Sequence, residues 1–253
     1  MAGERSKDAR RKRSRRSWDR GSSRERRNKE TSTKSALDKT STVERAVAEV
    51  RSGDVMMVGG FHDVGSPASL ITEVVAQRIG NLTVIANDIP SLDRGVGRIV
   101  SAGLTSRIVT SHIGPGLVMQ RKIGAGELRV ETLPQGTLAE RIRCGGAGLG
   151  GFLTPTGLGT AMADDKRIVE VDGIRFLLEA PLTADVALIT AFRGDRWGNL
   201  TYRGTARNLN PVMAAAATRL VIAEVEELYE IGDLDPNGIE TPGVYVDMVV
   251  EAK

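Results

Sequence analysis

Apolar residues recur at two spacings in residues 41–253, the body of the chain. A helical spacing begins after Ser41, which stands three residues before Glu44, as in a capping box. The helical set consists of Val43, Ala46, Val47 and Val50. Residues 55–58 are continuously apolar, which is typical of a strand covered on both faces. We therefore expect an amphipathic helix that ends near Gly53 and then a buried strand.

A second helix and a second strand follow a glycine-rich loop at residues 59–65. Ser66 can cap a helix that has Pro67 at its first position and ends at Gly80. Its predicted buried residues are Leu70, Ile71, Val74, Val75 and Ile79. Residues 82–85 then form the next strand. This strand–loop–helix–strand order predicts a βαβ unit, which places ligands beyond the carboxyl ends of its strands, where the loop lies.

Later apolar and β-branched runs predict the rest of the sheet. The further strands are expected at residues 108–111, 128–133, 186–190 and 220–225. Asn210 with Pro211 marks a helix start before the last of them. Residues 145–159 are so rich in glycine that we expect a loop or a close-packed turn there. The predicted fold class is α/β, with residues 41–253 as a single domain built on an open, mostly parallel β-sheet flanked by helices.

The positive charge of the chain is confined to its first residues. Residues 1–40 contain 15 Lys and Arg against 6 Asp and Glu, whereas the remainder contains 20 against 26. With almost no apolar residues, residues 1–40 are predicted to be a disordered basic N-terminal extension. The missing apolar segment excludes a secretory signal. A nucleic-acid-binding arm is an alternative, but no RNA-binding or helix-turn-helix pattern accompanies it, so nucleic acid is not the expected partner.

Cysteine and histidine are too scarce for a disulfide or a metal site. Cys144 is the only cysteine, and His62 and His112 lack further ligands at metal-binding spacing. The longest apolar runs have the length of strands rather than of a membrane span. We expect a cytoplasmic protein with no metal and no membrane partner.

The loop at residues 59–65 does not fit two common phosphate-binding motifs. Ser66 stands where a Walker loop has Lys, and the G-x-G-x-x-G spacing of a dinucleotide fingerprint is absent. Two interpretations stay open on physical grounds. The loop is either a plain tight turn or a cradle whose backbone N–H groups face an anion or a carbonyl.

The sequence G-G-F-x-x-x-G-x-P in this loop, after an apolar strand, resembles the signature of family I CoA-transferase alpha subunits. Further matching segments occur in the family's order at residues 86–88, 134–143, 144–148, 154–157, 198–200 and 206–208. Residues 144–153 are most similar to alpha subunits of the acetate and acetoacetate (butyrate–acetoacetate) type. The resemblance covers residues 40–250 and implies the alpha subunit of a short-chain acyl-CoA transferase.

The resemblance also implies a mechanism and a partner. In this family the beta subunit provides a glutamate that attacks the acyl-CoA thioester, and a glutamyl-CoA intermediate then passes CoA to a carboxylic acid. That glutamate lies in a Ser-Glu-Asn-Gly type motif, which this chain lacks. Its own Glu140, Glu224, Glu226 and Glu227 are expected to be helix-surface or strand-end carboxylates. The implied assembly is α2β2, with CoA as cosubstrate and no other cofactor.

The resemblance assigns candidate site residues as well. Gln135 is the candidate catalytic residue, a donor to the oxyanion; the alternative is a glutamine that bonds loop backbone. Asn87 is expected to line the substrate pocket, or else to be a turn residue. The candidate substrate- and CoA-binding loop is Gly59, Gly60, Phe61, His62, Asp63, Val64 and Gly65. Phe61 is either a pocket wall or a core residue.

Several alternatives stay open. Within the enzyme class, the alpha-type subunit of a 3-oxoacid or 3-oxoadipate CoA-transferase is the second choice. Outside it stand a sugar-phosphate isomerase or deaminase on a similar fold and a non-catalytic binding or regulatory protein. Cys144 is either a reactive thiol or buried filler, and Arg207 either meets a CoA phosphate or forms a structural ion pair.

Overall fold

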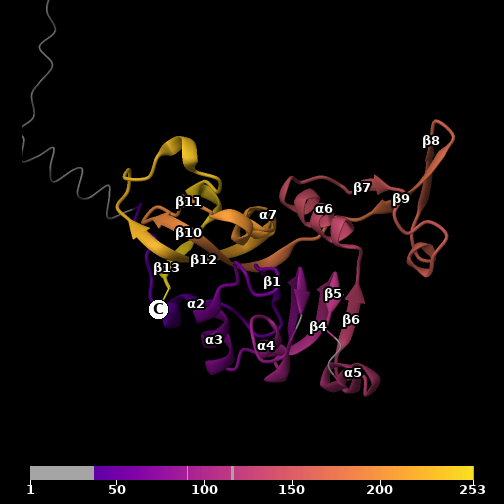
Figure 1. Ribbon diagram of the computed structural model, residues 1–253, viewed down its shortest axis with the longest axis horizontal. Coiled ribbons are helices and arrows are strands. Elements are labelled where there is room, and N and C mark those ends of the chain that lie inside the picture. Colours follow the sequence, from indigo (N-terminus) through magenta and orange to yellow (C-terminus); the bar gives the residue numbers. More distant parts are fainter. Residues whose placement is uncertain (1–36, 90, 115–116, 253) are drawn as a thin grey trace, which may run out of the picture. The chain divides into compact units, whose positions relative to one another are not determined.

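A mostly parallel β-sheet organises the protein, whose computed structural model describes residues 37–89, 91–114 and 117–252 (Figure 1). The eight-stranded sheet has the order β13-β12-β10-β1-β2-β4-β6, with β11 paired antiparallel to β10. All other neighbours along this order are parallel. Its strands are β1 (Val55–Val58), β2 (Leu82–Ala86), β4 (Thr105–Thr110), β6 (Arg129–Thr132), β10 (Ala184–Asp195), β11 (Leu200–Thr201), β12 (Ala217–Tyr229) and β13 (Met248–Glu251). The predicted fold class is confirmed.

Helices cover both faces of this sheet, because its strands carry apolar side chains on both sides. The helices are α2 (Val43–Val47), α3 (Ala68–Ala76), α4 (Gly97–Ser101), α5 (Leu117–Gly124), α6 (Gln135–Gly146) and α7 (Asn210–Ala216). In Figure 1, α2, α3 and α4 lie on the lower side of the sheet, and α6 and α7 lie on the upper side. Short 3-10 turns occupy Ala161–Ala163, Gly204–Arg207, Pro236–Gly238 and Gly243–Tyr245.

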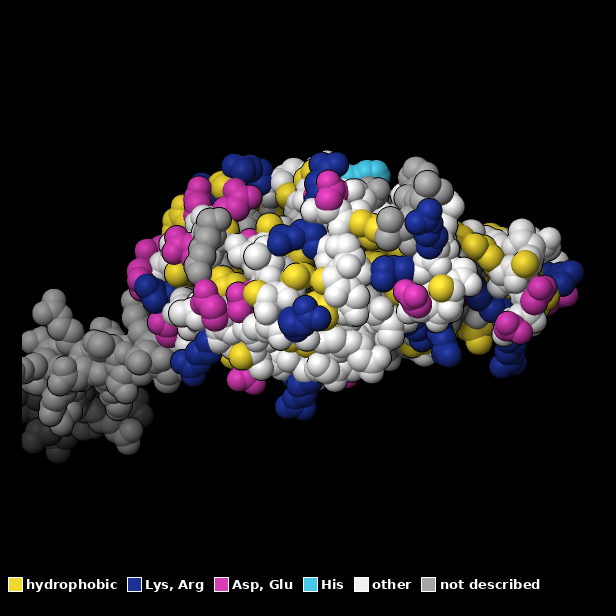
Figure 2. Space-filling view, turned by 90° about the horizontal axis from the view of Figure 1, so that it is seen from below, with side chains coloured by type: hydrophobic (Ala, Val, Ile, Leu, Met, Phe, Trp, Pro, Cys, Tyr) yellow, Lys and Arg dark blue, Asp and Glu magenta, His cyan; other side chains and the backbone are white. Residues whose placement is uncertain are grey.

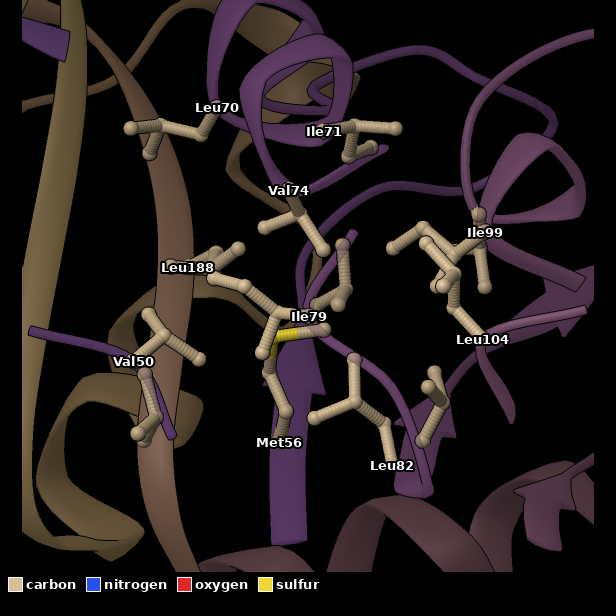
Figure 3. Packing of buried hydrophobic residues seen from close by; sticks show 14 of the residues in the cluster. Val50, Met56, Leu70, Ile71, Val74, Ile79, Leu82, Ile99, Leu104 and Leu188 are labelled. Carbon is tan, nitrogen blue, oxygen red and sulfur yellow. The ribbon is translucent and has the colours of Figure 1, made fainter. Parts of the chain in front are cut away.

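Two apolar cores result, one on each face. Met56 and Met57 are consecutive in β1 and both fully buried, yet they belong to different cores because successive side chains of a strand point to opposite faces. Met56 packs with α2, α3 and α4. Figure 3 shows side chains of α3 facing those of β1 and β10 in this core. Met57 packs with α6 and α7.

The helix starts differ in detail from the predictions. Thr42, and not Ser41, caps α2 by accepting from the backbone N–H of Arg45, while the backbone N–H of Ser41 donates to Val249 of β13. The predicted cap Ser66 is wrong as well. Pro67 is the N-cap of α3, which ends at Ala76.

Regular structure extends into the glycine-rich region that was expected to be a loop. Helix α6 continues through Gly145 and Gly146, because these glycines let it approach its neighbours. A Cβ at Gly145 would lie 1.9 Å from the carbonyl oxygen of Leu182, and one at Gly146 would lie 3.0 Å from Ala215 of α7. A short strand, β7 (Phe152–Thr154), follows.

Two smaller sheets complete the fold. Strand β7 joins β9 (Ile174–Glu179) and β8 (Ile168–Val171) in an antiparallel sheet of order β7-β9-β8, and neither β8 nor β9 was predicted. The two-residue strands β3 (Asp88–Ile89) and β5 (His112–Ile113) pair in parallel. Within the described residues no helix is long and apolar enough to cross a membrane.

Candidate active site

The ends of neighbouring parallel strands bring the candidate residues to one edge of the sheet. The loop at residues 59–65 follows β1, Asn87 follows β2, and Gln135 stands three residues after β6. Strands β1, β2, β4 and β6 are consecutive neighbours in the sheet and all run in the same direction. Their carboxyl ends therefore form a common edge, the usual position of ligands in such sheets.

Two amide side chains meet at this edge. The Nε2 of Gln135 donates to the Oδ1 of Asn87 across 3.1 Å. Asn87 is fully buried, yet its Nδ2 has no hydrogen-bond partner among the described residues. A buried donor left unpaired costs about 1–3 kcal/mol. Because Gln135 is exposed and begins α6, its amide N–H₂ lies at a point that a ligand can reach, with the spare N–H of Asn87 buried behind it.

The loop at residues 59–65 is a tight turn with an unusual backbone. Phe61 and Val64 exchange two backbone hydrogen bonds, of 3.0 and 2.9 Å. Between them His62 and Asp63 have φ values of 47° and 69°, in the left-handed region that non-glycine residues rarely adopt. Phe61 is 41% exposed, so it is not a core residue. This loop thus keeps an aromatic side chain on the surface beside the strand ends.

A buried carboxylate holds the left-handed turn in place. The Nδ1 of His62 lies 3.0 Å from the Oδ2 of Asp88, and the backbone N–H of His62 donates to the same carboxylate at 3.1 Å. Asp88 is 6% exposed and directly follows Asn87. The loop is thereby attached to the residue beside the amide pair. Within the described residues, no hydrogen bond joins the loop to Gln135 directly.

On its other side the loop is held by Asn210, the first residue of α7. The Nδ2 of this fully buried side chain donates to the carbonyl oxygens of Gly65 and Ala206, at 3.1 and 3.0 Å. Its Oδ1 accepts from the backbone N–H of Thr190. A Cβ at Gly59 would lie only 1.8 Å from this Oδ1, so only glycine fits there. The sequence marked Asn210 as a helix start and not as a site residue, since an Asn before Pro is a common helix signal.

A cavity of about 300 Å³ opens beside the loop, at the start of α3. It is lined by Asp63, Ser66, Ala68, Asp93, Arg94, Gly95 and Arg98. Arg94 lies 3.5 Å from the carboxylate of Asp63, and Arg98 donates to Thr72. Because two arginines face two aspartates here, the lining has no net charge and does not select an anion by charge alone.

Glu224 is not the strand-end carboxylate that was expected. It lies inside β12, is 4% exposed, and its Oε2 accepts from the backbone N–H groups of Ser69 and Leu70 at 3.0 and 3.1 Å. Glu224 of β12 therefore takes the capping role at the start of α3 that was predicted for Ser66. Burial raises the pKa of the Glu224 carboxyl above its ordinary value, although the hydrogen bonds from Leu70 and Ser69 oppose this shift.

The remaining candidate nucleophiles are engaged with arginines. Glu140 pairs with Arg143 on the surface of α6, and Glu226 and Glu227, near the end of β12, pair with Arg203 and Arg193. These three positions agree with the prediction. None of them lies in the loop beside the amide pair.

Two further residues, Cys144 and Arg207, had two interpretations each in the sequence. Cys144 is fully buried in α6, as expected of a filler side chain rather than a reactive thiol. Arg207 forms an ion pair with Glu240, which is the structural use. In the described part of the chain, no group of three or more His, Cys, Asp or Glu side chains could hold a metal ion.

Comparison with known proteins connects this site to an enzyme family. The model of the family described as coenzyme A transferase matches residues 40–252. The alpha subunit of the acetate CoA-transferase of Escherichia coli (strain K12) is 45% identical over 212 residues, which cover 84% of this chain and 96% of that protein. The corresponding alpha-type subunit of the 3-oxoadipate CoA-transferase of Pseudomonas putida is 43% identical over 211 residues, covering 83% and 91%.

Two more comparisons agree with this family: one with a further relative and one with a solved structure. The alpha subunit of the acetoacetyl-CoA:acetate/butyrate CoA transferase of Clostridium acetobutylicum is 44% identical over 201 residues, covering 79% of this chain and 92% of that protein. The crystal structure of the acyl-CoA transferase YdiF from Escherichia coli O157:H7 superimposes with a TM-score of 0.74 at 21% identity. It covers 85% of this chain but 47% of YdiF, and at this identity it shows the shared fold.

Proposed function

The chain belongs to the coenzyme A transferase family, and from this premise we propose how its residues take part in moving CoA from an acyl-CoA to a carboxylic acid. It is the alpha subunit of a heteromeric CoA-transferase of the acetate and acetoacetate type. Its similarity to the 3-oxoadipate relative is nearly as high, so 3-oxoacids are the alternative substrates. The acids that we propose are short-chain carboxylic acids.

The observation that carries the proposal is the amide pair at the sheet edge. Gln135 and the buried Asn87 offer N–H donors without offering a nucleophile. A carbonyl oxygen that gains negative charge during attack on a thioester is stabilised by such donors, and each is worth about 10²–10³ in kcat. We assign Gln135 as the principal donor to this oxyanion and Asn87 as the residue that positions it and faces the substrate.

The covalent steps need a carboxylate from a second subunit. A glutamate oxygen bonds to the acyl carbon of the thioester, the C–S bond breaks, and the CoA thiolate leaves with its electron pair. The thiolate then attacks the glutamyl carbonyl of this mixed anhydride and releases the first acid. The acceptor carboxylate repeats the sequence in reverse on glutamyl-CoA. In this chain Glu140, Glu226 and Glu227 pair with arginines and Glu224 caps α3, which supports a nucleophile supplied in trans.

The loop at residues 59–65 has a positioning role in this scheme. Its fixed turn keeps Phe61 and Val64 at the surface, whereas Gly59 and Gly60 are buried and Gly65 is half-buried. This small apolar rim can approach the thioester end of CoA, whereas the backbone N–H groups of Gly59, Phe61, His62 and Val64 are already bonded within the protein. We further propose a beta-subunit partner, an α2β2 assembly, a cytoplasmic location, and CoA as cosubstrate without another cofactor.

The test is a CoA-exchange assay on the purified chain, with and without a co-expressed beta-type subunit. In this assay acetyl-CoA is offered with acetate, butyrate, acetoacetate and 3-oxoadipate, and exchange is followed by separation of the CoA esters. We expect exchange only in the complex, with the highest kcat/KM for a short-chain acid. Full activity of the chain alone would contradict the nucleophile in trans, and inactivity of an intact complex with every acid would contradict the proposed function.

A further inference from the structure

The antiparallel sheet β7-β9-β8 has one face that is entirely apolar. Paired residues of antiparallel strands share a face, and the register pairs Val171 with Ile174, Val169 with Phe176, and Leu153 with Leu178. We call these six side chains, which come from all three strands, the apolar arm face. Leu153, Val171 and Ile174 are 39%, 43% and 58% exposed.

The opposite face is covered in part by the protein itself. It carries the fully buried Leu177, which lies against the turn at Gly157, and Glu179, which pairs with Lys166. Glu170 and Arg175 form a cross-strand pair on this same side. In Figure 1 the three strands lie at the right, beyond α6, and Figure 2 shows apolar side chains at the surface of that end. The opposite face exposes Ile168, Glu170 and Arg175 beside its buried residues, so among the described residues the apolar arm face is the one whose paired side chains are all apolar.

We propose that the apolar arm face is a docking surface for the beta-type subunit that completes the enzyme. This inference rests on the proposed function, because it takes from it the need for a second subunit. A run of exposed apolar side chains without a charge is typical of a surface that another protein covers. The occupant presents a complementary apolar patch that excludes water from Val171 and Ile174.

Its size argues against a dimer of this chain that is held by two arm faces alone. Strands β7, β8 and β9 have three, four and six residues, so the face spans at most roughly 20 Å by 14 Å, on the order of 300 Å². A stable interface buries about 800 Å² on each partner. The arm face paired with itself would thus be too small to hold two copies together. It fits as one region of a larger contact with a subunit that also touches the protein elsewhere.

Helix α6 connects the apolar arm face to Gln135 in the candidate active site. Gln135 is its first residue, and β7 begins six residues after its last, Gly146. Twelve helical residues are about 18 Å long. A subunit that brings a carboxylate to Gln135 therefore has to extend only on the order of one helix length and a short turn to reach the arm. Leu149, in that turn, is itself 46% exposed.

The test changes the face while preserving the hairpin. The double variant Val171→Lys, Ile174→Glu replaces an apolar cross-strand pair by an ion pair at the same two positions, so the strands stay paired. The matched control is Glu170→Arg, Arg175→Glu, which exchanges the charges of the adjacent pair on the opposite face. Binding of each chain to the purified beta-type subunit is measured by analytical ultracentrifugation, with the thermal unfolding of each chain alone as the folding check.

We expect the Val171→Lys, Ile174→Glu chain to have an affinity for the beta-type subunit that is about a hundredfold weaker, as for loss of an interface hot spot, and the control to bind within about threefold of the unchanged chain. CoA exchange by the variant should recover at saturating beta-type subunit. Equal binding by both variants would overturn the inference. So would a wild-type homodimer that this variant dissociates while beta-subunit binding is unchanged, because a second copy would then be the occupant. Normal assembly of a wild-type complex that exchanges no CoA would instead contradict the proposed function.

Discussion

At the scale of single residues, the site depends on amides that are held by other polar groups. Gln135 is exposed but shares a hydrogen bond with a buried asparagine, which limits the directions that its own N–H groups can take. A donor that is already oriented costs little reorganisation when charge develops on a substrate oxygen. The two amides are therefore better described as one unit than as two independent residues.

Replacement of Gln135 tests this unit directly. In the assembled enzyme we expect Gln135→Ala to lower kcat by about 10²–10³, because one oxyanion donor is lost. The matched control is Gln77→Ala, since Gln77 is an exposed helix-end amide that bonds Glu73 and the backbone of Glu44. Steady-state kinetics of both variants check the expectation. A loss below threefold for Gln135→Ala, with assembly intact, would remove it from the mechanism.

His62 tests the turn beside the amides. His62→Gly keeps the backbone able to adopt a φ of 47° and removes the side-chain contact with Asp88 together with the ring contact to Phe61. His62→Asn tolerates the same φ and retains a donor. We expect His62→Gly to raise the KM for acyl-CoA about fivefold through the added freedom of the loop, about 1 kcal/mol, and His62→Asn to restore most of the loss. Equal KM values in the two variants would show that the side chain does not hold the loop.

At the scale of elements, two polar side chains connect strands and helices that are distant in sequence. Asn210 joins the start of α7 to the loop after β1, and Glu224 joins the middle of β12 to the start of α3. Both are buried, and both satisfy backbone groups that would otherwise lack partners. They fix the loop beside the amide pair and the start of the helix that follows this loop.

The contact of Gly59 with Asn210 predicts a non-additive pair of substitutions. Gly59→Ala should cost about 1–3 kcal/mol, because its methyl group would overlap the Asn210 side chain. Asn210→Ala should also destabilise, since it leaves the carbonyl of Gly65 unpaired. In the double variant the overlap is gone, so the summed cost should fall by about 1 kcal/mol or more. Urea denaturation of the four chains measures the cycle, and strict additivity would contradict the predicted contact.

Glu224 predicts a particular pH dependence of stability. Its folded-state pKa is raised by burial, so folding takes up a proton on this group. The contribution of Glu224 to the free energy of unfolding should therefore fall as pH rises from the ordinary glutamate value of 4.5 through the raised folded value, and stay constant above it. Glu224→Gln should lack this fall. Denaturation of both chains across that range checks the sign, and a difference that grows with pH would refute it.

The sequence predicted the central strands and the loop after the first one, because a strand buried on both faces has to be continuously apolar. Strand β1 and the edge that carries Asn87 follow from that rule. The caps did not follow, because Thr42 and Glu224 depend on contacts across the sheet. Strands β8 and β9 were missed, since one face is apolar and exposed and thus lacks the usual contrast between buried and solvent sides. The loop and Gln135 were found through the family resemblance, whereas Asn210 offered only the signal of a helix start.

At the scale of the whole molecule, both ends of the described chain are joined to the sheet. The backbone of Lys39 and Ser41 pairs with Val249 of β13, and the Nζ of Lys39 donates to the carbonyl oxygens of Gly243 and Val246, both at 2.7 Å. The predicted disordered extension at residues 1–40 lies almost entirely outside the described residues and stays a prediction. Its boundary with the domain can be tested at these contacts.

Two truncations separate the extension from the domain. A chain that starts at residue 37 should unfold at the same urea concentration as the full chain. A chain that starts at residue 42 should lose about 2–4 kcal/mol, because it lacks the bonds of Lys39 and Ser41 to the C-terminal segments. Equal stability of the two truncated chains would show that these contacts contribute little.

The rate at which the single thiol reacts can report the opening of helix α6. Cys144 is fully buried in the helix that begins with Gln135, and no other cysteine competes for a thiol reagent. A reagent can modify it only during the intervals in which α6 separates from its neighbours. The labelling time of the native chain therefore reports how often the support of the amide pair opens, and a bound beta-type subunit or acyl-CoA should lengthen that time if either holds α6 closed.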